Sequence, residues 1–312
     1  MHMLNTFLKG EAGTRLRFSG MLLSTILVLL SVFTISQKGL NFGLDFTGGY
    51  LTEFTTSQGV ELKQLEQFIT KNHNGEFELT AQGNNHFQLR EAPSGSTANS
   101  NDWQSGITQN ADINAEVVSS AYIGSQVGDE LFEQGCLALF SAMVAVMLYL
   151  AVRFEWRLAV GSVVALVHDL LLVLGLFSLL SIEFNLTVLA SLLAIIGYSL
   201  NDSIIVGDRV RELLRVKSNN ALSPASIINN AIKSTLTRTL ITSGTTLATV
   251  ASVWLLAGAP LQGFAIALFT GIVVGTFSSI CIAATLPELL GLSAKNYEEK
   301  QDAETQALLD MP

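Results

Sequence analysis

The sequence is poor in charged residues and in cysteine. Charged residues make up 14% of the chain, whereas ordinary soluble domains contain about 25%. Hydrophobic residues make up 49%, so the composition excludes an ordinary soluble protein and indicates a membrane protein. The two cysteines, Cys136 and Cys281, both lie in apolar runs, and we interpret them as small core residues rather than as a disulfide.

The sequence also lacks the residue sets that a membrane enzyme needs. Only one of its 4 histidines, His168, lies in an apolar run, and it has no HExxH, GxSxG or cysteine cluster. We therefore expect no catalytic residues, no metal site and no cofactor.

Long apolar runs are what the sequence has instead. Crossing about 30 Å of hydrocarbon takes about 20 apolar residues. Six windows satisfy this, and they cover residues 18–37, 135–152, 158–182, 186–207, 239–257 and 263–286. The first is too long for a cleaved signal peptide and has no small-residue cleavage site, so we interpret it as an uncleaved anchor. The pattern predicts an all-α bundle of six transmembrane helices.

The basic residues predict the orientation of these helices. If the N-terminus is cytoplasmic, 13 of the 17 lysines and arginines lie in cytoplasmic segments, as the positive-inside rule requires. Residues 1–17 and 208–238 are then cytoplasmic, and so is the acidic tail 291–312, which we expect to be disordered. Residues 18–37 form the first transmembrane helix, and residues 134–290 contain the other five.

Residues 38–133 form one large external segment. It holds 4 basic and 13 acidic residues, a net charge of −9, which argues against a nucleic-acid partner. Residues 51–57 are strand-like, 60–73 have helical spacing, and 75–91 alternate on both sides of Gly83 as in a hairpin. We predict an inserted α+β domain that begins β-α-β-β, with a mobile loop at 92–109 and a further strand before the second transmembrane helix.

Ionisable residues within the apolar windows are the first functional candidates. His168 and Asp169 lie near the middle of the third window, and Asn201 and Asp202 lie in the fourth. An aspartate at the centre of a membrane helix costs at least about 2.5 kcal/mol and needs a partner or water. His168 and Asp169 are explained equally well as hydrogen-bonded structural residues, whereas Asp202 has the weakest structural explanation.

The fifth window supplies a possible partner for Asp202. Polar residues recur there at steps of 4, 3, 4 and 3, on one face of a helix, and this stripe must face protein or water. Its members are Arg238, Thr242, Thr245, Thr249 and Ser252. Arg238 is also explained as a cation that reaches the headgroups. Burial disfavours the charged form of a carboxyl group and a nearby cation favours it. We therefore predict that Asp202 and Arg238 form a proton relay assisted by Asn201, Asp169 and His168, beside a polar groove lined by Tyr198, Thr242, Thr245 and Thr249.

Four motifs together resemble the SecD/SecF family of bacterial protein-export membrane proteins. They are GLDFTGG at 43–49, HDLLL at 168–172, GYSLNDSIIVGDRVRE at 197–212 and RTLITSGTT at 238–246. The resemblance implies a six-helix half of a resistance-nodulation-division type fold with an inserted periplasmic domain. It also implies a place in the inner membrane, with both termini in the cytoplasm.

The resemblance also implies the function and the partners. The expected function is to use the proton-motive force for late steps of preprotein export. The expected partners are SecD, the SecYEG channel, the translocating preprotein and membrane lipid, with YajC as a further candidate. Gly43, Gly48 and Gly49 are expected to form a hinge, since glycine adopts backbone angles closed to other residues. The alternatives are a subunit of a proton-driven small-molecule exporter and a purely structural assembly subunit.

Overall fold

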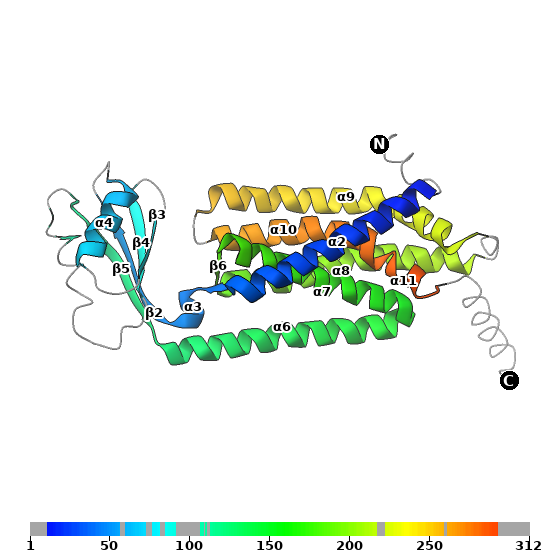
Figure 1. Cartoon of the computed structure of the whole chain (residues 1–312), viewed down its shortest axis with the longest axis horizontal. Coiled ribbons are helices and arrows are strands. Elements are labelled where there is room, and N and C mark those ends of the chain that lie inside the picture. Colours follow the sequence, from blue (N-terminus) through cyan, green and yellow to red (C-terminus); the bar gives the residue numbers. More distant parts are fainter. Residues whose placement is uncertain are drawn as a thin grey trace.

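The chain folds into an elongated helix bundle with a small α+β domain at one end (Figure 1). The structure is a computed structural model that describes residues 11–56, 60–72, 77–81, 85–91, 107–108, 110, 113–216, 222–258 and 261–292. The predicted loop 92–109, apart from 107–108, and the predicted tail beyond residue 292 lie outside this range. We call the end of the bundle that carries the α+β domain the domain end, and the opposite end the far end.

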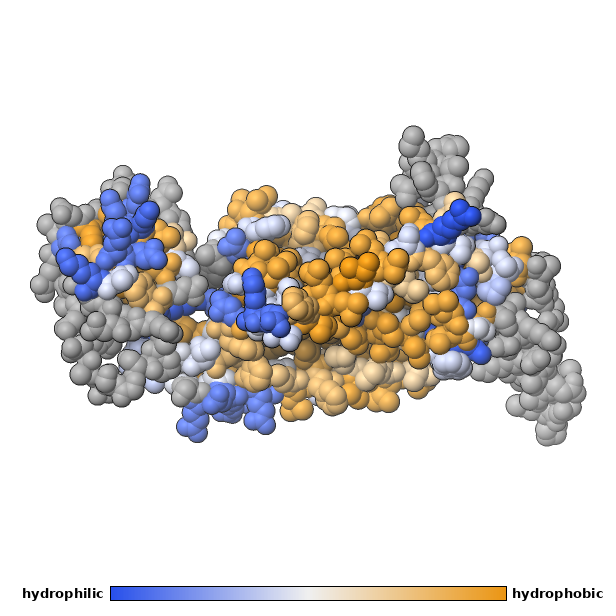
Figure 2. Space-filling view, in the orientation of Figure 1, coloured by the Kyte–Doolittle hydropathy of each residue, from blue (hydrophilic) through white to orange (hydrophobic). Residues whose placement is uncertain are grey.

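Six helices among the described residues are long and apolar enough to span a membrane. They are α2 (Glu11–Lys38), α6 (Ser125–Arg153), α7 (Trp156–Leu180), α8 (Leu186–Arg215), α9 (Pro224–Leu256) and α10 (Gln262–Ser278), the last of which continues through the π-helix η3 (Ser279–Ala283) into α11 (Leu286–Leu289). All six predicted windows are therefore confirmed as helices. Hydrophobic side chains cover most of the visible bundle surface, while hydrophilic ones gather on the α+β domain and near the bundle ends (Figure 2).

The helices at the far end are longer than the apolar windows. Residues 208–238, predicted as one short segment, consist largely of the last turns of α8 and the first turns of α9. The α9 helix starts at Pro224, and the Ser223 hydroxyl accepts a hydrogen bond from the backbone N–H of Ser226. Serine at the N-cap followed by proline is a strong helix start, which explains why α9 begins well before its apolar window.

The α+β domain contains the predicted β-α-β-β order. Its elements are β2 (Gly49–Thr55), α4 (Leu62–Asn72), β3 (Phe77–Ala81) and β4 (His86–Glu91), followed by β5 (Glu116–Ile123). The strands form one antiparallel sheet in the order β3-β4-β2-β5, and β3 and β4 are the predicted hairpin. Phe54, Phe87 and Leu89 pack with Leu65 and Ile69 of α4 in a buried core.

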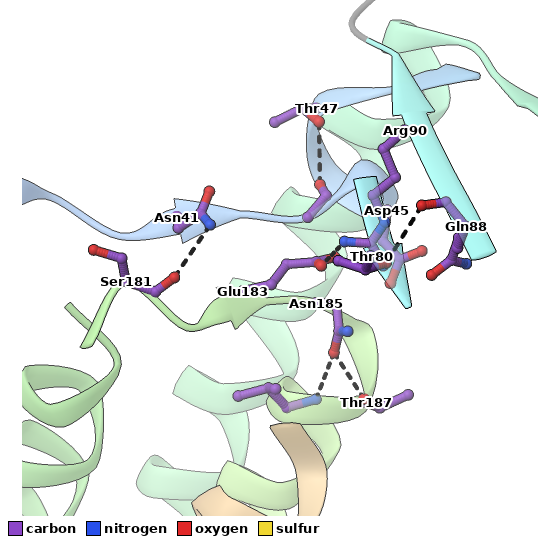
Figure 3. A network of polar contacts seen from close by, with 12 residues as sticks. Asn41, Asp45, Thr47, Thr80, Gln88, Arg90, Ser181, Glu183, Asn185 and Thr187 are labelled. Carbon is purple, nitrogen blue, oxygen red and sulfur yellow. Dashed lines mark hydrogen bonds and ion pairs between the residues drawn. The ribbon is translucent and has the colours of Figure 1, made fainter. Parts of the chain in front are cut away.

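The segment that joins α2 to the sheet is bound to the bundle. Its short strand β1 (Asn41–Phe42) pairs in parallel with β6 (Glu183–Phe184), which precedes α8. The next element is the one-turn helix α3 (Leu44–Thr47), which buries Phe46. The Phe46 ring lies 5.8 Å from the rings of both Phe132 and Phe184. Polar contacts around this junction connect β1, α3, β4 and the start of α8 (Figure 3).

A buried arginine joins three elements at the far end. The Arg17 side chain is fully buried on α2. It donates hydrogen bonds to Asn229 Oδ1 at 2.8 Å, Thr285 Oγ1 at 3.2 Å and Glu288 Oε2 at 2.9 Å. From the sequence alone, Arg17 is only one of the basic residues that predict the orientation of the helices in the membrane. In the structure it holds α2 against α9 and the end of the sixth span.

We expect Arg17→Ala to destabilise the bundle strongly, because it leaves Glu288 and Asn229 without this partner. Removing one member of a buried ion pair costs about 3 to 5 kcal/mol. Unfolding of the purified protein by SDS in mild detergent measures this loss. Arg15→Ala, at an exposed position on the same helix, is the control and should change the unfolding midpoint little. Equal midpoints for the two variants would contradict the structural role of Arg17.

Candidate proton site within the helix bundle

Asp169 is the centre of a buried polar cluster between three helices. It lies on α7 and is completely buried, as His168 nearly is. His168 Nδ1 lies 2.9 Å from Asp169 Oδ1. Asp169 Oδ2 accepts hydrogen bonds from Ser199 of α8 at 2.5 Å and from Ser278 of α10 at 2.9 Å. The carboxylate therefore has the hydrogen-bond partners that its burial requires.

Small residues on α10 make room for this cluster. A side-chain carbon at Gly275 would lie 3.3 Å from Ser199 Cβ and 3.4 Å from Asp169 Oδ2, and one at Gly271 would lie 2.4 Å from Ile195 of α8. The close-packing face that the spacing of Ala267, Gly271 and Gly275 predicts is thus occupied by α8.

Asp202 is almost as buried as Asp169 but has fewer partners. Its side chain is 1% exposed. Ser243 of α9 donates to Asp202 Oδ2 over a long 3.5 Å, while Asp202 Oδ1 has no hydrogen-bond partner among the described residues. The Ser243 hydroxyl also lies 2.7 Å from Thr276 Oγ1 of α10. A carboxylate with so few partners is costly to bury, which sets Asp202 apart from the fully hydrogen-bonded Asp169.

Arg238 lies near Asp202 but does not pair with it. Its side chain is exposed on α9, and its positive charge acts on Asp202 electrostatically. Of the ion pairs formed between described residues, none joins the two. The structure thus brings the predicted pair into electrostatic range and leaves them separate.

The predicted polar groove lies on the bundle surface. Thr245 and Thr249 are exposed and Thr242 is half-buried, and each donates a hydrogen bond to a backbone carbonyl of its own helix. Tyr198 is half-buried and donates to Thr246 over 3.3 Å. The residues that face inward belong to the adjacent row of α9, which includes Thr239 and Ser243.

An exposed face of α8 and α9 adjoins these threonines. On α8 it consists of small residues and one amide, and on α9 of glycine, alanine and threonine. We define this open face as Ala190, Ala194, Gly197, Asn201, Gly244, Thr245, Ala248 and Thr249. A side-chain carbon at Gly197 or Gly244 would meet nothing within 4 Å. Because polar groups within a membrane must face protein or water, this face is suited to contact another protein.

The three predicted hinge glycines have different surroundings. Gly48 and Gly49 have positive φ angles of 69° and 137°, where other residues are strained. Gly43 has an ordinary φ of −74° and is needed for space, since a Cβ there would collide with the carboxylate of Glu183. Its backbone N–H also donates to Phe184 O at 2.9 Å. Movement at this junction stays a prediction, with Gly48 and Gly49 as its natural positions.

The described residues contain no group of three or more histidine, cysteine, aspartate or glutamate side chains that would hold a metal ion. Apart from Arg17 and Asn229, the buried polar side chains of the described bundle are hydroxyls, the His168 imidazole and the carboxylates of Asp169 and Asp202. These features define a class: a multi-pass membrane protein that forms one six-helix half of a resistance-nodulation-division type fold.

Comparison with known proteins gives the family. Residues 104–292 match the family model described as protein export membrane protein SecD/SecF, C-terminal, and residues 33–60 match the SecD/SecF GG motif. The chain belongs to the SecD/SecF family. It is 40% identical over 290 residues to the protein translocase subunit SecF of Vibrio alginolyticus, covering 90% of this chain and 91% of the relative. It is 37% identical over 296 residues to the SecF of Escherichia coli O157:H7, with 92% and 91% covered.

Solved structures agree with this assignment. The crystal structure of SecDF, a translocon-associated membrane protein from Thermus thermophilus, superposes with a TM-score of 0.76 at 34% identity, over 86% of this chain. SecDF in a super-membrane-facing form gives a TM-score of 0.65 at 31% identity, over 93% of this chain. The chain spans 37% and 39% of those two structures, so it corresponds to a part of each of them.

The two buried carboxylates should respond differently to substitution. Asp169→Leu removes the shared acceptor of Ser199 and Ser278, and each buried polar group left unsatisfied costs about 1 to 3 kcal/mol. We expect a large loss of monodisperse protein in size-exclusion chromatography. Asp169→Asn keeps an acceptor oxygen and should recover most of the yield. Asp202→Asn should match the unmodified protein, and a loss as large as that of Asp169→Leu would show that Asp202 is also structural.

Proposed function

We propose that the chain is the membrane subunit of a bacterial preprotein translocase that uses the proton-motive force to promote late steps of protein export. One observation carries this proposal: Asp202 is buried within a membrane helix, is held by a single long hydrogen bond, and lies within the electrostatic range of Arg238. The relatives named protein translocase subunit SecF support the translocase part of the proposal.

The proposed location is the bacterial inner membrane, with both termini in the cytoplasm and the α+β domain in the periplasm. The distribution of basic residues supports this orientation. Arg153, Arg157, Arg209 and Arg211 gather near the far end, at the termini of α6, α7 and α8. The remaining hydrophobic surface of the helix bundle then faces lipid.

SecD is the proposed occupant of the open face. Small residues allow close helix approach in membranes, and the chain corresponds to only part of the SecDF structures that it resembles. SecYEG and the translocating preprotein are the further proposed partners, with YajC as a candidate. A nucleic-acid partner is not proposed.

In the proposed cycle Asp202 takes up a proton from the periplasmic side and releases it to the cytoplasm. Arg238 approaches during release and favours the charged carboxylate. Asn201 and the threonines of the open face line the route once SecD covers it, and His168 and Asp169 hold α7 and α10 in register with α8. A proton that crosses the membrane supplies about 2.3 kcal/mol per 100 mV, which is enough to bias two conformations that differ by a few kcal/mol.

The conformational change that we propose is a movement of the α+β domain about Gly48 and Gly49. Two alternative functions make different predictions. A small-molecule exporter shares the buried aspartate, but the translocase relatives do not favour it. A purely structural subunit would carry no titrating group, so Asp202 distinguishes it.

We expect Asp202→Asn to abolish the proton-dependent part of export while leaving assembly with SecD intact. The substitution keeps the size of the side chain and removes its titration. Export of a preprotein into inverted membrane vesicles, with and without an imposed proton gradient, measures the effect. Arg238→Lys keeps the charge but loses the planar guanidinium, so it should be partly active. If export by Asp202→Asn responds normally to the gradient, Asp202 carries no proton in the cycle and the purely structural alternative is favoured.

We expect Gly197→Trp to prevent pairing with SecD without unfolding the chain. Its side chain would project from the open face into empty space in the isolated subunit. Co-elution of tagged SecD in mild detergent measures pairing. Leu29→Trp is the matched control, because Leu29 is 65% exposed on α2, outside the open face. Normal co-elution of Gly197→Trp would move the SecD contact to another surface.

A further inference from the structure

A cavity of about 780 Å³ separates the sheet from the domain end of the bundle. One wall is the α+β domain, with residues from β2, β3, β4 and α4. The other is formed by the ends of α7, α8 and α10 together with β6. The lining includes Leu51, Thr80, Gln88, Arg90, Glu183 and Thr187.

The sheet presents its second face to this cavity. Phe54, Phe87 and Leu89 point to the other side, into the core under α4. Leu51 stands directly opposite Arg90 in the β2–β4 pairing, and Thr80 stands opposite Gln88 in the β3–β4 pairing. Residues opposite one another in an antiparallel pair share a face. The cavity therefore reaches the sheet face opposite the α4 core, and it also extends round the edge of β3 to Leu62 of α4.

One ion pair crosses the cavity from wall to wall. Arg90 of β4 pairs with Glu183 of β6, and their side chains are 18% and 20% exposed. The close-up view shows the two side chains meeting between the sheet and the segment that leads into α8 (Figure 3). The pair is therefore mostly buried. Opening the cavity returns both charged groups to water, and their hydration offsets much of the attraction that is lost.

The chemistry of the lining indicates the kind of ligand. Among the described lining residues, Asp45 is the only charged one besides Arg90 and Glu183, and it already accepts a hydrogen bond from the backbone N–H of Leu186 at 2.9 Å. The rest are leucines, isoleucines and small residues together with uncharged amides and hydroxyls. This set does not suit a phosphate or another strongly charged ligand. Amides and hydroxyls bind peptide groups, and leucines accept apolar side chains.

The sheet also offers an edge for a peptide backbone. Strand β3 ends the order β3-β4-β2-β5, with no further described strand beside it. Its residues 79–81 line the cavity. Extended peptides bind such edges by adding a strand, with main-chain hydrogen bonds giving affinity and alternate side chains entering pockets.

We propose that this cavity binds an extended segment of the polypeptide in transit, alongside β3, and that the Arg90–Glu183 pair closes it. The proposal rests on the proposed translocase function and names the surface that touches the substrate. Binding through the backbone tolerates many sequences, as a general export machine requires. Opening of the pair admits the segment, and the pair re-forms after the segment leaves.

Site-specific photocrosslinking tests the proposal. A photoreactive phenylalanine analogue is placed at Thr80, at Thr187 on the opposite wall, or at the control position Val118, which is 62% exposed on β5 and outside the cavity. Each full-length chain, assembled with SecD in inverted vesicles, is irradiated with a preprotein stalled during export. We expect severalfold more preprotein adduct at Thr80 and Thr187 than at Val118. Equal adduct at all three positions would overturn the proposal.

Charge reversal tests the closure. Arg90→Glu should increase the adduct at Thr80 severalfold by opening the pair, and Arg90→Glu with Glu183→Arg should restore the lower level. No change in either variant would overturn the role of the ion pair. The same vesicles report proton-dependent export. If that export is normal and Thr80 gives no more adduct than Val118, the cavity is not the binding site while the proposed function stands.

Discussion

The hydrogen bonds to Asp169 are the interaction on which the rest of the bundle depends. A carboxylate in hydrocarbon is costly unless its oxygens are satisfied, and here the partners come from three different helices. The positions of α7, α8 and α10 are thereby fixed relative to one another. Gly275 is glycine because α10 must approach this carboxylate closely, and the register of α8 against α10 sets the direction in which Asp202 points.

Asp202 shows the opposite use of the same residue type. It lies three positions beyond Ser199 on α8, so the hydrogen bonds to Asp169 hold its backbone in place. Its own side chain has one long hydrogen bond to a described residue. The proposed proton uptake at Asp202 depends on such incomplete satisfaction, because strong hydrogen bonds to one protonation state would fix it. Asp169, by contrast, holds α7, α8 and α10 together through its hydrogen bonds.

The sequence predicted the six spans well, because hydrocarbon thickness imposes a length and composition that local sequence shows directly. It also predicted the β3–β4 hairpin and the position of Asp202 inside a membrane helix, while the proton role of Asp202 stays a prediction. It missed Ser243, since α9 carries two adjacent polar rows and helical spacing alone does not determine which one faces inward. It missed Ser199 and Ser278 because each is a single small hydroxyl on its helix, and their shared acceptor Asp169 lies on a third helix. Arg17 was missed for a related reason: an arginine near the end of an apolar run is usually a headgroup anchor, and only the tertiary fold shows the partners that bury it.

The helix α8 connects the two ends of this arrangement. Its first turn is fixed by the Asp45 carboxylate and by the N-cap Asn185, whose Oδ1 accepts a hydrogen bond from the backbone N–H of Val188. Asp202 lies 16 residues after Leu186 on the same helix, which is about 24 Å at 1.5 Å per residue. In the proposed cycle, a shift at the domain end of α8 would displace Asp202 relative to Ser243 and Arg238. Because β1 and α3 lie on the bundle side of Gly48 and Gly49, the Arg90–Glu183 pair just before α8 is the contact that would carry a movement of the α+β domain to this helix.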